Sequence, residues 1–263
     1  SSDGLDYLLD KVNQTATLYQ LNDDFTEGSL IIPDYVSSNG ISYPVTTITA
    51  SAFTQNNKIT SLSLGNQLKS IPVSAFSYCT RMTSELVIPD SVTSIGDSAF
   101  QSCDALEKIV IGNGVTTIGK HAFNGCTSVT ELHFGDSVRT ISAAAFANLS
   151  SLTGTIVLPP SIASLQGNAS YTGTGAFSNC SQITAVIFQG SNASIGAHVF
   201  DGCSALNALV VPSNTTFHSK AFGTSSTWFS GIIYVVGDSC TMSDIPTTAV
   251  RAVSYTHLTL PTI

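Results

Sequence analysis

The sequence predicts an elongated right-handed solenoid of stacked coils with a parallel β-sheet along one wall. Three observations predict it: a recurring Phe, two alternating apolar residues after each Phe, and a hydroxyl residue at one fixed slot before the next Phe. The recurring residues are Phe53, Phe76, Phe100, Phe123, Phe146, Phe177, Phe200 and Phe222, separated by 23, 24, 23, 23, 31, 23 and 22 positions. A unit this short cannot bury its own apolar face, so neighbouring units must stack.

A short strand follows each Phe. In the unit that begins at Ala99, Ile109 and Ile111 stand nine and eleven positions after Phe100. A period of two in branched residues is typical of a strand with one buried face, and such strands in register form a parallel sheet with roughly 4.8 Å between coils. One extra residue precedes the strand in two units, whose apolar pairs are Leu86 and Ile88, and Ile156 and Leu158.

The hydroxyl slot stands directly before a second apolar position. It holds Thr47, Ser70, Ser94, Thr117, Thr140, Ser164, Ser194 and Thr216. Eight hydroxyls in register predict a column. Either they satisfy backbone groups or one another between coils, because unpaired buried polar groups are costly, or they form a solvated edge.

The segment around each Phe, with the pattern AFxxC, is expected to form a helical or 3₁₀ turn on the wall opposite the sheet. Ala, Phe and the slots three and six positions after Phe would share one helical face. Five of the six cysteines fill the slot at three, namely Cys79, Cys103, Cys126, Cys180 and Cys203.

Leu149 fills the cysteine slot in one unit, which indicates a small buried apolar position. We therefore expect free buried thiols, because an in-register column points its side chains alike and a disulfide needs converging Cβ atoms. A disulfide framework is the alternative, since the cysteine count is even. Cys103 beside Asp104 is accordingly interpreted as core rather than as a reagent.

The repeated pattern AFxxCxxLxxIxIxxxVxxIG resembles the BspA-like leucine-rich repeats over roughly residues 29–236. The resemblance implies a leucine-rich-repeat fold with capped ends. The expected organisation is an N-terminal cap with the first strand at 1–44, repeats at 45–230 and a C-terminal cap strand at 231–250. Residues 251–263 carry no repeat slot and are interpreted as a non-native, disordered tail.

Composition and motifs exclude several classes of function. Only 10% of residues are charged and the formal net charge is −8, whereas nucleic-acid binding needs clustered Lys and Arg. No apolar run approaches the roughly 18 residues that a membrane helix requires. The chain has no CxxC or HExxH motif, so we expect scattered surface histidines, no metal or cofactor, and no catalysis.

The outward face of the sheet is the candidate partner-binding surface. An apolar stripe rimmed by polar groups can mark a partner site, although branched residues also simply suit a pleated surface. The candidate residues are Glu85, Val87, Lys108, Val110, Glu131, His133, Val157, Ile187 and Val210.

The family resemblance implies a function for this surface. Members occur on the surface of, or are secreted by, host-associated bacteria and some parasitic protists, and they are implicated in adhesion. We expect a secreted or cell-surface monomer, with any export signal outside this chain, that binds a protein or glycan ligand on a host or neighbouring cell. The alternative is a structural spacer that holds another domain away from the cell surface.

Overall fold

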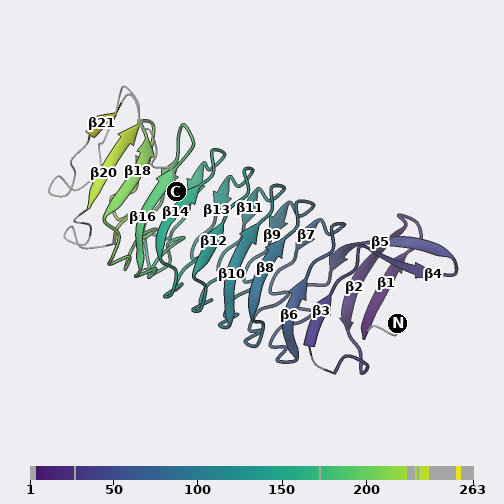
Figure 1. The fold of residues 1–263 in the computed structure, drawn as a ribbon. Helices are drawn as coiled ribbons and strands as arrows, with labels where there is room; N and C mark the ends of the chain where they lie inside the picture. The colour runs from purple at the N-terminus through teal and green to yellow at the C-terminus, as the bar shows by residue number, and fades with distance from the viewer. Residues whose placement is uncertain are drawn as a thin grey trace.

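A computed structural model describes residues 4–26, 28–171, 173–223, 229 and 231–236, and the backbone of 253–255. The coils stack along one long axis, from the N-terminal strands to β20 (Ile232–Val236) (Figure 1). One continuous hydrophobic core runs from Leu5 to Val235. The right-handed sense of the coil stays a prediction.

The main wall carries parallel strands, as the alternation of apolar residues predicts. They fall into three sheets rather than one. The first pairs β3 (Gly28–Ile31) with β6 (Ile59–Ser63). The second contains β8 (Ser84–Ile88), β10 (Leu106–Ile111) and β12 (Glu131–His133). The third contains β14 (Gly154–Leu158), β16 (Ile183–Phe188), β18 (Ala208–Pro212), β20 and β21 (Val253–Tyr255).

Both breaks in the main wall coincide with the units that carry an extra residue. The first break precedes β8 and the second precedes β14. One additional residue moves the following N–H and C=O groups out of step with those of the preceding coil, so the ladder stops there. The coils still touch at the first break, where the amide of Thr83 donates to the carbonyl of Thr60 at 2.9 Å.

A second, narrower sheet runs without interruption along the stack. It consists of seven parallel two-residue strands: β7 (Ser70–Ile71), β9 (Ser94–Ile95), β11 (Thr117–Ile118), β13 (Thr140–Ile141), β15 (Ser164–Leu165), β17 (Ser194–Ile195) and β19 (Thr216–Phe217). Each strand begins with a residue of the predicted hydroxyl column, and consecutive hydroxyl residues pair in register.

The hydroxyls of this column do not link the coils. Among the described residues, only Thr47 makes a side-chain hydrogen bond, with the neighbouring Thr46 at 3.5 Å. The preceding slot supplies the links instead, since Thr93 Oγ1 donates to the carbonyl of Lys69 at 3.0 Å and Thr116 Oγ1 to that of Thr93 at 3.1 Å. The column is half-buried to exposed, which favours the solvated edge.

The AFxxC wall consists of overlapping turns, and the described residues contain no helix. Alternate amides have different partners: the amide of Cys79 donates to the carbonyl of Phe76 in its own coil, whereas the amide of Phe76 donates to Ala99 in the next. Residues with a left-handed backbone conformation, such as Ser74 (φ 52°) and Tyr78 (φ 58°), occur within the turns. The described residues therefore do not confirm the predicted helical or 3₁₀ turn: each coil has only single turns closed by bonds such as that from Cys79 to Phe76, because every other amide donates to the next coil.

The Phe side chains form a stacked column inside this wall. From Phe53 to Phe177, successive ring centroids lie 5.1 to 5.5 Å apart and the ring planes differ by 4° to 21°. This spacing follows the distance between hydrogen-bonded strands, so the rings are held in contact at every coil.

The two ends differ from the repeats. At the N-terminus, β1 (Leu5–Asp10), β2 (Thr15–Leu21), β5 (Ile41–Ile48) and β4 (Tyr35–Ser38) form a four-stranded sheet, in the order β1-β2-β5-β4, that covers the end of the stack (Figure 1).

At the C-terminal end, β20 continues the main wall beside β18. The predicted cap strand therefore lies at β20, while 237–250 lie outside the described residues. Three residues of the predicted tail form β21, which pairs with β20 in parallel. The remainder of the tail is also outside the described residues.

Two neighbouring threonines test the assignment of the hydroxyls. Thr116→Val should lower the free energy of unfolding by about 0.5–1 kcal/mol, because it removes the bond to the carbonyl of Thr93. Thr117→Val should change it by less than about 0.5 kcal/mol, since this hydroxyl has no described partner. Urea unfolding compares the two variants, and an equal or larger loss for Thr117→Val would contradict the solvated edge.

Candidate partner-binding face

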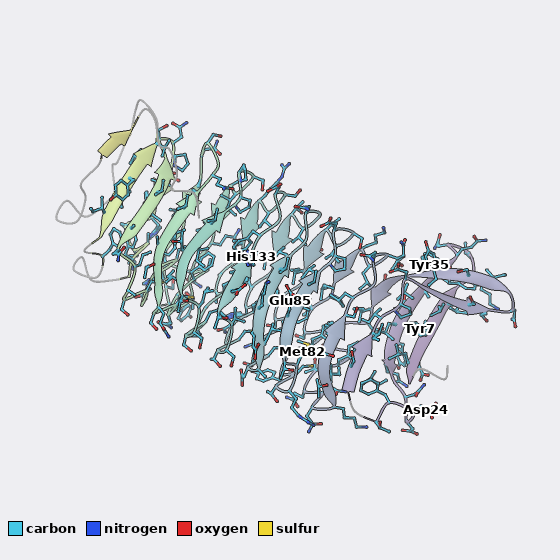
Figure 2. All side chains as sticks on the ribbon, viewed as in Figure 1. Tyr7, Asp24, Tyr35, Met82, Glu85 and His133 are labelled. Carbon is cyan, nitrogen blue, oxygen red and sulfur yellow. The ribbon has the colours of Figure 1, made fainter. Side chains whose placement is uncertain are left out.

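The outward face of the main wall contains all nine predicted site residues. Each is exposed or half-buried, while the alternate residues of the same strands lie in the core. Figure 2 shows Glu85 and His133 on this face of the sheet. The alternation of apolar and other residues therefore placed the candidate side chains correctly, but the breaks between sheets divide them into groups.

Four residues on β8, β10 and β12 form what we call the charged patch: Glu85, Lys108, Glu131 and His133. Strand register places Lys108 between Glu85 and Glu131. Its Nζ lies 3.1 Å from Glu85 Oε1 and 3.6 Å from Glu131 Oε2. His133 Nε2 lies 3.4 Å from the same Glu131 oxygen.

The contacts of the charged patch shift two of its pKa values. Hydrogen bonding to Glu85, together with the charge of Glu85, raises the pKa of Lys108. The hydrogen bond with His133, and next the charge of Lys108, lower the pKa of Glu131 below 4.5. The Lys108 side chain is 36% exposed and the carboxylates more so, and exposed ion pairs of this kind stabilise a fold little. The patch is thus available to a partner at little cost to folding.

The second group is an apolar row on β14, β16, β18 and β20: Val157, Ile187, Val210 and Tyr234. Consecutive members are direct neighbours in register. All four side chains are half-buried, because each is flanked by its cross-strand neighbours. Val87, which is 50% exposed, and Val110 lie instead beside the charged patch, in register with His133.

Sequence reasoning missed two outward residues at the ends of the face. Ile31 is 62% exposed and pairs with Ser63, which stands in the same outward position of the next strand. Tyr234 extends the apolar row by one strand. Both could have been found by extending the alternation into the segments GSLI and IIYVV.

The cysteine column performs a role that sequence reasoning did not foresee. The five residues Cys79, Cys103, Cys126, Cys180 and Cys203 are free and buried, as expected. Each Sγ donates to the carbonyl of the Phe in the preceding coil, at 3.1 to 3.2 Å. Leu149 cannot donate a hydrogen bond, so the bond to the Phe carbonyl of the preceding coil is absent at this position. The slot therefore selects a small side chain with a weak donor rather than only a small apolar one.

Burial makes these thiols poor nucleophiles. It raises the pKa of the Cys79 thiol from 9.0 to about 11 and that of Cys180 to about 12. Thiolates are the reactive form, so near neutral pH these groups are inert. Within the part of the chain that the structure describes, no three His, Cys, Asp or Glu side chains gather as metal ligands.

His198 departs from the expectation of surface histidines. Its side chain is 1% exposed, and its Nδ1 lies 3.1 Å from Asp201 Oδ2. The unit before it carries an enlarged loop at residues 166–175, whose backbone packs against that of His198, since a Cβ on Gly175 would meet the His198 carbonyl. The described residues include no helix that could cross a membrane.

The fold defines a repeat protein whose outward strand residues lie along one wall. Residues 46–172 and 161–228 match the family model described as a BspA-type leucine-rich repeat region, in six copies. The chain therefore belongs to the BspA-type leucine-rich-repeat family. A search of the curated proteins found no match.

Several solved structures share the fold. The leucine-rich repeat protein TpLRR of T. pallidum is 22% identical, with a TM-score of 0.65 over 78% of this chain and 89% of that chain. A leucine-rich repeat protein from Eubacterium ventriosum is 20% identical, with a TM-score of 0.51 over 81% and 67%. One from Bacteroides ovatus is 16% identical, with a TM-score of 0.50 over 95% and 89%.

The buried thiols predict a loss of stability in alkali. A folded pKa above the unfolded value stabilises the fold below the unfolded pKa, and this stability is lost as the pH rises through the folded pKa. The free energy of unfolding should therefore fall between about pH 9 and 11. Cys79→Ala should flatten this fall, measured by urea unfolding across that range, and parallel curves for the variant and the parent would contradict the assignment.

The charged patch predicts a site-specific titration. His133→Phe should raise the pKa of Glu131 toward its ordinary value, and Lys108→Met should raise it by a smaller amount. Carbon-detected NMR titration of the side-chain carboxyl measures both changes. Lys69→Met, a lysine outside the patch, is the control, and a pKa of Glu131 that stays the same in both patch variants would rule out the contacts.

Proposed function

We propose that this protein is a secreted or cell-surface adhesive scaffold, monomeric and non-catalytic, that binds a protein on a host or neighbouring cell. The binding surface is the outward face of the main wall. The observation that carries the proposal is the pairing of the apolar row with the charged patch on one face of a rigid stack.

Rigidity supports this proposal because a binding surface that is already ordered loses little entropy on association. The outward residues sit on strands whose inward residues are fixed in the core, and the strands are linked from coil to coil. Val157, Ile187 and Val210 are thereby presented at one-strand intervals. An extended partner segment could contact several of them at once.

The chemistry of the two groups suits a protein partner. The apolar row provides area whose burial is favourable, and Tyr234 at its end is of a residue type enriched in interface cores. The charged patch would orient a partner by charge complementarity. Lys108 lies between two acidic side chains, and the partner's basic residues would meet these first. Adhesion follows from the family resemblance, and leucine-rich-repeat scaffolds offer broad surfaces of this kind.

The test replaces the apolar row without disturbing the strands. Val157→Thr, Ile187→Thr and Val210→Thr, combined in one chain, keep the β-branched shape and add a hydroxyl at each outward, half-buried position. Binding to an array of extracellular matrix proteins should weaken at least about tenfold relative to the parent.

The matched control is Val73→Thr, which changes a valine that is 51% exposed on a turn outside the main wall. It should leave binding unchanged. If the triple variant retains full binding to every matrix protein that the parent binds, the face is not the site. If the parent binds none of them, the structural spacer becomes the better account.

A further inference from the structure

A second surface, away from the outward face, is formed where the repeat is enlarged. Between Phe146 and Phe177 the chain is about one-third longer than in the other units, and the additional residues form a loop. Beside this loop lies a groove of about 430 Å³. It is lined by Lys120, Ala143, Ser164, Leu165, Gln166, Gly167, Asn168, Ala169, Ser194 and Gly196.

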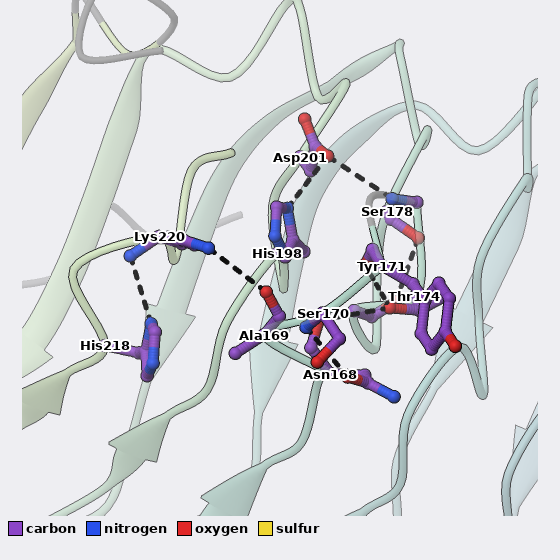
Figure 3. A network of polar contacts seen from close by, with 12 residues as sticks. Asn168, Ala169, Ser170, Tyr171, Thr174, Ser178, His198, Asp201, His218 and Lys220 are labelled. Carbon is purple, nitrogen blue, oxygen red and sulfur yellow. Dashed lines mark hydrogen bonds and ion pairs between the residues drawn. The ribbon is translucent and has the colours of Figure 1, made fainter. Parts of the chain in front are cut away.

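The loop that bounds the groove is held in place by named contacts (Figure 3). Lys220 Nζ donates to the carbonyl of Ala169 at 3.2 Å, and the amide of Gly173 donates to Asp201 Oδ2 at 3.3 Å. Asp201 is fixed in turn by the buried His198.

Inside the loop, the amide of Ser170 donates to Asn168 Oδ1 at 2.9 Å, and Thr174 Oγ1 donates to the carbonyl of Tyr171 at 2.6 Å. These bonds join the side chains of Asn168 and Thr174 to the backbone of the same loop. The groove is therefore a built feature of the fold.

Several polar side chains line the groove without a hydrogen-bond partner among the described residues. The hydroxyls of Ser164 and Ser194, the side-chain amide of Gln166 and the ammonium of Lys120 make no hydrogen bond with any described residue. No described carboxylate lies within 4.0 Å of Lys120 Nζ. Gly167 and Gly196 let the backbones of neighbouring coils pack closely at the groove, since a Cβ on either would meet the backbone of the next segment. A chain with only 9 basic residues among 263 thus places an unpaired cation at this groove.

We infer that the groove binds a short glycan that carries a carboxylate, such as a uronic acid. Hydroxyl and amide groups exchange hydrogen bonds with sugar hydroxyls, and an ammonium forms a charge-assisted bond with a carboxylate. The volume is in the range of small-ligand sites, roughly 300–1,000 Å³. Tyr171, which is 66% exposed on the same loop, adds an apolar ring within two residues of Ala169.

A peptide fits the groove less well than a sugar. Of the lining residues only Leu165 has a large apolar side chain, and it is buried in the core, so the groove offers no pocket for an apolar peptide side chain. It lies beside strands of the narrow sheet that already have partners on both sides, so no strand edge is open to a peptide. The inference does not depend on the proposed function of the outward face.

The test uses the full chain and two disaccharides that differ mainly in their carboxylates, digalacturonic acid and galactobiose. In amide-detected NMR titrations at millimolar concentration, digalacturonic acid should shift the signals of Lys120, Gly167, Asn168 and Gly196. Lys120→Gln should weaken this binding at least about tenfold, and Lys120→Arg should retain most of it. Galactobiose should bind more weakly than digalacturonic acid.

Controls make each outcome decisive. Lys69→Gln, on another exposed lysine, should leave the affinity unchanged, and Ser194→Val should reduce it without changing the urea midpoint. The inference is overturned if digalacturonic acid shifts none of the four signals, or if galactobiose binds as tightly. It is also overturned if Lys69→Gln weakens binding as much as Lys120→Gln, or if triglutamate shifts the same signals at lower concentration.

Discussion

Hydrogen bonding between the backbones of successive coils is the constraint on which the rest of this structure depends. It fixes the distance from one coil to the next, so every slot of the repeat lies directly against the same slot of its neighbour. The Phe rings stack at 5.1 to 5.5 Å for this reason, and each cysteine thiol reaches the carbonyl of the preceding Phe. Side chains that would be unremarkable singly become continuous columns, and the columns together are the core.

The same constraint distinguishes side chains that repeat at every coil from side chains that vary between coils. Groups that repeat at every coil, such as the thiols, have their hydrogen-bonding capacity used by the neighbouring coil and are withdrawn from solvent. Groups that differ from coil to coil are the ones that we propose for recognition: Lys108 between its two carboxylates, and Lys120 beside the enlarged loop.

The repeat period predicted the stack, the buried Phe and cysteine slots, and the outward direction of all nine candidate residues, because these follow from alternation and spacing alone. The predicted helical or 3₁₀ turn of the AFxxC wall is not confirmed beyond single turns, since the face shared by Ala and Phe says nothing about where their amides donate. The extra residue before Leu86 and before Ile156 was visible, but its effect depends on the neighbouring coil, so the breaks in the main wall were not foreseen. The burial of His198 and the groove beside Gln166 arise from one irregular loop, which periodicity cannot describe.

The uninterrupted narrow sheet has a consequence for how such a chain can change over generations. Between β7 and β13, each coil meets the next through equivalent residues, so removing or duplicating one whole unit rejoins surfaces that already match. A partial unit would put Phe opposite a strand residue and disrupt every column. Recombination between the repeated coding segments can therefore lengthen or shorten this molecule in steps of one coil, and the length of its outward face becomes a trait inherited in discrete increments.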